Sequence, residues 1–171
     1  PERYRDPTEF KRQYDRRRAD WQSLLAQPNA ETPVPELDRF LNTWLKNQLY
    51  LTFRYVRSGA IGFRDTLQDT WGYTLLEPAA SRASLLRALS HIQRNGVCPR
   101  GYSIIDEQHD LRSFMDSGTW IAMTLVDWIR ETGDITILNE TSPWLDSDKH
   151  DTVESHVWAA MDLLYEKRGR Y

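Results

Sequence analysis

The chain has 171 residues, enough for one domain or a large part of one, with a net charge of −3 and a sequence pI of about 5.8. This charge balance gives no electrostatic support to a nucleic-acid-binding function. The single cysteine, Cys98, excludes an intrachain disulfide and a thiolate metal cluster, and it favours a cytoplasmic location. No apolar run approaches the roughly 20 residues that a membrane span needs. We therefore expect neither nucleic acid nor a membrane among the partners.

Hydrophobic periodicity predicts a helix in most of the chain. The expected helices cover residues 8–27, 35–56, 66–76, 78–94, 116–131, 135–139 and 148–168. Thr8 is the expected N-cap of the first helix, and Asp116 or Ser117 that of the fifth. No segment shows the alternation of a strand bounded by hairpin turns. We therefore expect an all-α fold of six or seven helices, without a β-sheet of three or more strands.

Long loops alternate with short ones along this series of helices, which favours helical hairpins arranged in a ring with the long loops at one end. Residues 97–115 form one such loop without helical period, and loops of this length are often functional. Its acidic and histidine residues could resemble a metal cluster, but nothing fixes them on one face: Asp106, Glu107, His109 and Asp110. We expect no bound metal.

The most informative stretch is SGAIGFRDTLQDTW, residues 58–71, which places a cation, two carboxylates and an amide at the start of a helix. Asp65 and Asp69 are four residues apart, and Gln68 shares their face. Carboxylates accept sugar hydroxyls and the guanidinium of Arg64 donates to oxygens, so this pattern suits polyol binding. An alternative is that Asp65 caps the helix within a buried salt-bridge network. Arg54 either complements the dipole of the preceding helix or leans toward this loop.

Several motifs resemble the inverting β-glycoside phosphorylases of glycoside hydrolase family 94. They are FLNTWLKNQ (40–48), SGAIGFRDTLQD (58–69), DSGTWI (116–121), ETGD (131–134) and ILNE (137–140). The resemblance extends from about residue 35 to the end of the chain. It implies part of an (α/α)6 barrel made of helical hairpins, with residues 1–171 as the N-terminal portion of one catalytic domain.

The resemblance also implies a reaction and a site. Inorganic phosphate would attack a β-glucosidic bond and release α-glucose 1-phosphate with inversion, without a metal or organic cofactor. The implied substrate-binding residues are Arg54, Arg64, Asp65, Gln68, Asp69, Asp116 and Trp120. Among them, Arg54, Arg64 and Asp69 would hold the nonreducing-end sugar. The general acid would lie beyond Tyr171, in a glycine-aspartate-tryptophan-asparagine-aspartate motif that these residues lack.

Two departures from the family pattern concern the substrate. Where cellobiose and chitobiose enzymes have serine-aspartate-aspartate, this chain has Met115-Asp116-Ser117, which resembles the 1,2-β-oligoglucan branch. The tryptophan-rich histidine motif of the family is replaced by VCPRGY, residues 97–102. We expect a 1,2-β-glucan substrate and a location in the cytoplasm.

The chain begins at Pro1 and ends in RGRY, so we expect a piece of a longer enzyme that is inactive by itself. Its partners would be a β-glucan oligosaccharide, phosphate and the remainder of the same enzyme, with a homodimer left open. A partial barrel should also expose apolar surface along one edge. Two alternatives stay open: a non-catalytic helical carbohydrate-binding or interaction module, and a related glycosidase or transglycosylase.

Overall fold

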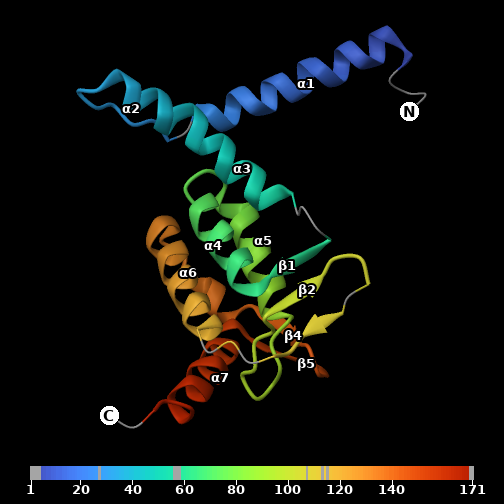
Figure 1. The fold of residues 1–171 in the computed structure, drawn as a ribbon, viewed down its shortest axis with the longest axis vertical. Coiled ribbons are helices and arrows are strands. Elements are labelled where there is room, and N and C mark those ends of the chain that lie inside the picture. The colour runs from blue at the N-terminus through green and yellow to red at the C-terminus, as the bar shows by residue number, and fades with distance from the viewer. Residues whose placement is uncertain are drawn as a thin grey trace. The chain divides into compact units, whose positions relative to one another are not determined.

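The computed structural model describes residues 5–26, 28–55, 59–106, 108–112, 114 and 116–169, whose elements are shown in Figure 1. Ser58, Glu107 and Met115, which entered the sequence-based predictions, lie outside the described residues. Contacts between residues divide the chain into two compact units, Pro1–Tyr50 and Leu51–Tyr171. Each unit is described by itself.

The first unit is helical. Helix α1 spans Pro7–Leu25, and α2 (Pro35–Arg39) continues through the π-helical turn η2 (Phe40–Leu45) into α3 (Lys46–Arg54). The long helix predicted over residues 35–56 is therefore confirmed, although a π-helical turn interrupts its α-helical pattern. The last residues of α3 belong to the second unit.

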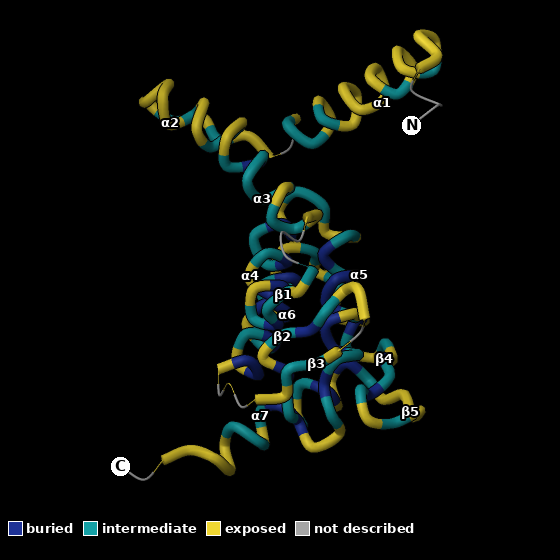
Figure 2. The backbone as a smooth tube through the Cα atoms, turned by 45° about the vertical axis from the view of Figure 1, so that its right-hand side comes forward, coloured by how far each residue is buried: buried dark blue, intermediate teal, exposed yellow. Residues whose placement is uncertain are grey.

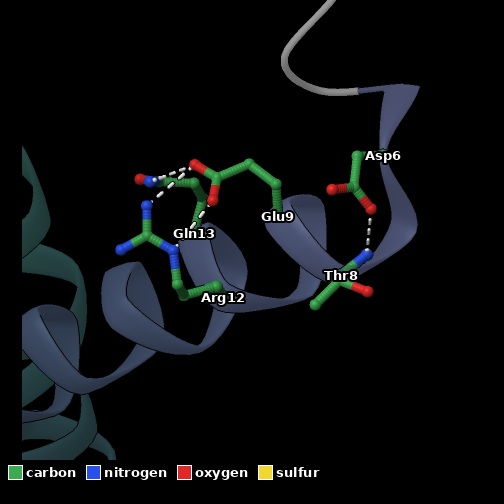
Figure 3. Close-up of polar contacts among 5 residues, drawn as sticks. All are labelled: Asp6, Thr8, Glu9, Arg12 and Gln13. Carbon is green, nitrogen blue, oxygen red and sulfur yellow. Dashed lines mark hydrogen bonds and ion pairs between the residues drawn. The ribbon is translucent and has the colours of Figure 1, made fainter.

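The start of α1 differs from the prediction, because Asp6 rather than Thr8 is the N-cap. The Asp6 carboxylate accepts a hydrogen bond from the backbone N–H of Thr8 at 2.9 Å. Figure 3 shows this cap beside the next turn, where Glu9 accepts hydrogen bonds from Arg12 and Gln13. Aspartate is among the preferred capping residues, and surface bonds between neighbouring turns add modest support. Since α1 has no buried residue, as Figure 2 shows, such local bonds matter for its stability.

Lys46 is the buried residue of α3, with 4% of its surface exposed. Its Nζ donates hydrogen bonds to the carbonyl oxygen of Leu25 at 2.7 Å and to Asn29 Oδ1 at 2.9 Å. Because the last carbonyls of a helix have no intrahelical donor, this ammonium supplies one to the C-terminal end of α1. Burial lowers the pKa of Lys46. The contact ties α1 to α3 within the first unit.

Four helices form the core of the second unit. They are α4 (Phe63–Tyr73), α5 (Pro78–Leu89), α6 (Ser117–Thr132) and α7 (Val153–Glu166). The short 3-10 helix η3 (Ile135–Asn139) lies between α6 and α7 in the chain. Helices α4, α5 and α6 pack against one another, and α7 packs against α6 (Figure 1). Fully buried side chains from all four helices meet in one cluster that includes Phe63, Leu67, Leu85, Leu89, Ile121, Leu125 and Val153.

Two small sheets accompany these helices, and the expectation that no three-stranded sheet forms is wrong. Strands β1 (Ala60–Gly62), β2 (Gly101–Ser103) and β3 (His109–Asp110) pair antiparallel in that order. Strands β4 (Thr141–Trp144) and β5 (Ser147–Thr152) form a separate hairpin. The six-residue β5 replaces the predicted first turn of the last helix, which begins at Val153. All other strands have two to four residues, too few for a period-two pattern to be recognised in the sequence.

Two glycines allow the backbone to approach closely. Gly96 has φ +83°, and a Cβ there would collide with the backbone carbonyl of Ala159 in α7. A Cβ on Gly101 would lie 2.7 Å from the carbonyl oxygen of Ile61, across the β1–β2 pair. A side chain would therefore push the sheet apart at Gly101 and displace α7 at Gly96.

The all-α fold class predicted from the sequence is confirmed, because helices supply the core and the strands are short connections between them. On α6, Met123 and Val126 are 41% and 48% exposed, and that such side chains form the open edge of a partial barrel stays a prediction. Within the described ranges, no helix has both the length and the apolar character needed to cross a membrane.

Candidate functional site

The junction between β1 and α4 carries the motif that the sequence singles out. Gly62 is the N-cap of α4, and the buried Phe63 follows it and donates its backbone N–H to the Arg100 carbonyl at 3.1 Å. This bond joins the start of α4 to the segment that leads into β2. The Asp65 carboxylate lies where a side chain on Gly62 would be, which explains glycine at that position. The anchored backbone presents Arg64 and Asp65 at the positive end of the helix dipole.

Arg64 and Asp116 form an ion pair that joins the first turn of α4 to the start of α6. Arg64 Nη1 lies 3.0 Å from Asp116 Oδ2, and the same oxygen accepts the indole N–H of Trp120 at 3.3 Å. The Trp120 ring in turn contacts Trp71 edge-to-face, with 6.0 Å between ring centroids. The hydrogen bond from Arg64 holds the pKa of the Asp116 carboxyl below its ordinary value, and the Trp120 bond acts in the same direction. The Asp116 carboxylate therefore stays charged and orients the guanidinium.

Arg64 has more N–H donors than its bond to Asp116 uses. Its Nε is buried and has no hydrogen-bond partner within the described part of the chain, although 42% of the whole side chain is exposed. Buried polar groups are rarely left without a partner, and an exception calls for an explanation. Because Nε itself is shielded, a bound ligand would contact the exposed part of the Arg64 side chain, which lines the cleft and carries further N–H donors.

A cleft of about 620 Å³ opens at this junction. Its walls are the first turns of α4 and α6 and the three-stranded sheet. The residues that line it are Ala60, Ile61, Gly62, Arg64, Asp65, Arg100, Gly101, Tyr102, Ser103, Gln108, His109, Asp110, Phe114 and Ser117. Charged, hydroxyl and amide groups beside an aromatic ring are the mixture that recognises polar, ring-shaped ligands.

Three of the seven predicted site residues are brought together by the fold, namely Arg64, Asp116 and Trp120, and Asp65 lies beside them in the wall of the cleft. The other three lie elsewhere. Gln68 borders a second cavity of about 470 Å³ between α4 and the end of α6. The roles of all seven residues in substrate binding stay predictions.

Asp69 faces α3 instead of the cleft. It accepts a hydrogen bond from the side chain of Thr52, and burial raises its pKa, with a further contribution from the charge of Asp65. The sequence left two alternatives open for Asp69, a structural carboxylate or a sugar ligand. The bond with Thr52 fits the structural alternative, and the sugar-binding role stays a prediction.

Arg54, the last residue of α3, makes its contacts at the C-terminal end of α4. Its guanidinium pairs with Glu77 at 2.8 Å, and Glu77 also accepts the hydroxyl of Tyr73 at 2.9 Å. Tyr73 is nine residues beyond Arg64 on the same helix, about 14 Å along its axis. The idea that Arg54 leans toward the loop of Arg64 is therefore not what the structure shows. Burial of Tyr73, with the bond to Glu77, raises its pKa to about 12.

The wall formed by β2 and β3 was missed by the sequence reasoning as part of the site. Tyr102 and His109 lie in these strands and Arg100 directly precedes β2, and all three line the cleft. The signal was the altered VCPRGY segment, whose arginine and tyrosine were noted only as a departure from a family pattern. The hairpin that brings His109 beside Tyr102 depends on strand pairing that no short-range pattern indicates.

The acidic loop residues are engaged with neighbours. Asp110 forms a bidentate pair with Arg112, which lowers the pKa of Asp110 to about 2. The Asp106 carboxylate forms hydrogen bonds with the Ser103 side chain and the backbone N–H of Gln108. Among the described residues, no three histidine, cysteine, aspartate or glutamate side chains are grouped as metal ligands would be. The arrangement offers hydrogen-bonding and charge, as sugar recognition requires.

These features define an all-α domain with a polar cleft at the N-terminal ends of two of its helices. The chain belongs to the Glycosyl hydrolase 94 superfamily, because the sequence profile of the catalytic domain of that superfamily matches residues 20–171. The match begins upstream of residue 35, where the motifs first indicated it. The catalytic domain of this family is an (α/α)6 barrel, of which the chain forms part.

Curated relatives support this assignment. The chain is 31% identical to solabiose phosphorylase of Paenibacillus borealis, over 83% of this chain and 19% of the relative. It is 30% identical to cellobionic acid phosphorylase of Neurospora crassa, over 91% and 21% respectively. A match of 27% to cyclic beta-(1,2)-glucan synthase NdvB of Rhizobium meliloti covers 89% of the chain and 6% of that protein. The chain thus spans about a fifth of the length of the first two relatives.

Proposed function

We propose that this chain is the part of a β-glycoside phosphorylase that holds the sugar on the cleavage side of the scissile bond. In this reaction a phosphate oxygen forms a bond to the anomeric carbon as the bond to the glycosidic oxygen breaks, and that oxygen takes a proton from a carboxylic acid. Attack from the opposite face gives an α-sugar 1-phosphate. Because phosphate is the nucleophile, one carboxylic acid suffices, unlike the two-carboxylate scheme of glycoside hydrolases.

The observation that carries this proposal is the fixed guanidinium of Arg64 in the cleft. Asp116 holds it through Nη1 and is itself oriented by the indole N–H of Trp120, while 42% of the Arg64 side chain stays exposed in the wall of the cleft. Hydrogen bonds from a charged donor to sugar hydroxyls contribute roughly 1.5–3 kcal/mol each. If they tighten as the ring flattens toward an oxocarbenium-like state, they lower the barrier to cleavage. Asp65, on the same helical turn, would accept hydrogen bonds from sugar hydroxyls.

For the substrate we propose a β-glucan oligosaccharide, with 1,2-β-glucan favoured. The Asp116-Ser117 variant of the motif and the similarity to cyclic beta-(1,2)-glucan synthase support this choice. Other relatives are named for solabiose, cellobionic acid and a glucosyl-glucuronide, so the linkage must be measured. Inorganic phosphate would be the co-substrate, without an organic cofactor or metal. Burial raises the pKa of the Cys98 thiol to about 12, which suits a free thiol in a reducing cytoplasm.

The 171 residues are not expected to turn over substrate by themselves. By family resemblance the general acid and the phosphate-binding residues lie in stretches that these residues do not include. General acid catalysis typically contributes roughly 10²- to 10⁴-fold. The proposed partners of this chain are the remainder of the catalytic domain, the oligosaccharide, phosphate and, in a homodimer, a second copy of the enzyme.

Sugar binding can be tested on the chain directly. We would titrate the ¹⁵N-labelled chain with sophorose, laminaribiose and cellobiose, with maltose as an α-linked control, and follow backbone and Arg64 side-chain resonances. The proposal expects shifts confined to the cleft with a β-linked disaccharide, largest with sophorose. Binding of none of the β-linked sugars, or equal binding of maltose, would contradict it. Release of α-glucose 1-phosphate from the same sugars by the full-length enzyme tests the reaction itself.

A further inference from the structure

Two histidines far apart in the sequence share a hydrogen bond at the edge of the cleft. His91 lies just after α5 and His109 lies in β3, and His91 Nδ1 is 2.8 Å from His109 Nε2. The His91 ring also stacks on the Tyr102 ring, with centroids 3.9 Å apart and planes inclined by 21°. Tyr102 and His109 line the cleft.

Further contacts anchor this cluster to the rest of the site. The Tyr102 hydroxyl lies 3.3 Å from Thr66 Oγ1, and Thr66 donates to the carbonyl oxygen of Gly62 at 3.0 Å. Tyr102 is buried, and His91 and His109 are half-buried. The cluster therefore ties the sheet wall both to the end of α5 and to the first turn of α4.

We propose that His91 is a positioning residue that fixes His109 in the cleft wall, where the outer ring nitrogen of His109 forms a hydrogen bond with a sugar hydroxyl. This inference rests on the proposed sugar-binding function and adds a contact that the family motifs do not include. The outer nitrogen, Nδ1, has no hydrogen bond to any other described residue. The ring nitrogen facing His91 is occupied, so Nδ1 is the one available to a ligand.

The outer nitrogen of His109 can act as either donor or acceptor toward a sugar hydroxyl, depending on the tautomers of the pair. If His91 Nδ1–H donates to His109 Nε2, the outer nitrogen of His109 carries a proton and donates to the sugar. If His109 Nε2–H donates to His91 instead, the outer nitrogen is a lone-pair acceptor. A neutral imidazole has one donor and one acceptor, so the hydrogen bond within the pair fixes what the outer nitrogen offers.

The surroundings keep His91 neutral. The groups that face it are His109 on β3, Tyr102 on β2 and Arg87 on α5. Burial, followed by the charges of His109 and Arg87, lowers the pKa of His91 to about 4. A neutral His91 can either donate to or accept from His109.

The experiment compares two variants with a matched control. His91→Phe keeps a ring on Tyr102 and removes the hydrogen bond, and His109→Phe removes the proposed sugar contact. His150→Phe changes an exposed histidine in β5, outside the cleft. A neutral hydrogen bond corresponds to about a 2- to 10-fold effect on affinity. We expect both cleft variants to bind sophorose about 2- to 10-fold more weakly than the unmodified chain, and His150→Phe to bind equally well.

A spectroscopic measurement on the unmodified chain keeps the inference falsifiable if a variant does not fold. Long-range ¹H–¹⁵N spectra report which ring nitrogens carry protons. We expect sophorose, added at a fixed pH, to shift His109 Nδ1 and to leave Nε2 and the His91 ring nearly unchanged. A purely structural pair would show no ligand-dependent shift at Nδ1.

The outcomes separate this inference from the function on which it rests. Sophorose binding with an unshifted His109 Nδ1, or with unchanged affinity in His91→Phe, overturns the role of the histidine pair and leaves sugar binding intact. Absence of sugar binding by the unmodified chain overturns the proposed function and the inference with it. Weaker binding by the cleft variants together with the Nδ1 shift establishes the contact.

Discussion

Replacing Asp116 with asparagine separates a sugar-positioning role from a structural one. The variant keeps an oxygen for the Trp120 indole and removes the charge that holds Arg64. Both side chains of the ion pair are nearly half exposed, at 42% and 48%. Such a pair contributes at most about 1 kcal/mol to stability, equivalent to roughly 2–4 °C in Tm for a domain of this size. Thermal melts of Asp116→Asn should therefore stay within a few degrees of the unmodified chain.

Sugar recognition should respond far more strongly than stability. A charge-assisted hydrogen bond from a correctly oriented Arg64 is worth about 1.5–3 kcal/mol, so sophorose affinity, and kcat/KM of the full-length enzyme, should fall about 10- to 100-fold. The matched control is Asp127→Asn, which removes another surface ion pair on the same helix, with Arg130 at 3.2 Å. It should leave sugar affinity unchanged. Normal sugar affinity in Asp116→Asn, or a melting temperature lowered by more than about 10 °C, would refute the reasoning.

The same pair gives a pH dependence of defined sign. Because Arg64 lowers the pKa of Asp116, the stabilising contribution is present above the ordinary value of 3.8 and is lost as the pH falls through the lowered value. The difference in Tm between the unmodified chain and Asp116→Asn should therefore shrink as the pH falls below about 3.8. An unchanged difference at pH 2 would argue against the ion pair as its source.

Three further predictions concern other positions. Asp69→Asn keeps an acceptor for Thr52 and removes a half-buried charge, so Tm should be unchanged or higher. If the carboxylate binds sugar, kcat/KM of the full-length enzyme should fall roughly 10- to 1000-fold. Normal turnover with a large loss of stability would make Asp69 a scaffold residue. Lys46→Met removes the donor to the Leu25 carbonyl and should lower the unfolding free energy by about 1–2 kcal/mol in urea, whereas an unchanged midpoint would show that the bond contributes nothing net. Gly96→Ala places a Cβ against the backbone of α7 at φ +83° and should cost more than about 2 kcal/mol in the same assay; a cost below 1 kcal/mol would mean that the helix moves aside freely.

The sequence by itself determined the helices and the chemical character of the site. Apolar residues repeating every three to four positions predicted each long helix, because a helix buries one face whatever its neighbours are. Arg64 and Asp65 lie within one motif at a helix start, so local spacing was enough to place them together. The family was also readable, since its motifs are short stretches with characteristic residues in a fixed order.

Only the tertiary structure decided which of these residues meet. Asp116 lies 52 residues after Arg64, and their pairing depends on how α4 and α6 pack. The strands of two or three residues that form the cleft wall arise from pairing between distant segments, which leaves no periodic trace in the sequence. The same pairing places His109 beside Tyr102, and packing of the sheet on the end of α5 adds His91. The helical repeat of apolar residues follows from backbone geometry and from the exclusion of apolar side chains from water. The contacts that form the cleft follow instead from packing over the whole unit. For that reason the cleft could be recognised only in the folded chain.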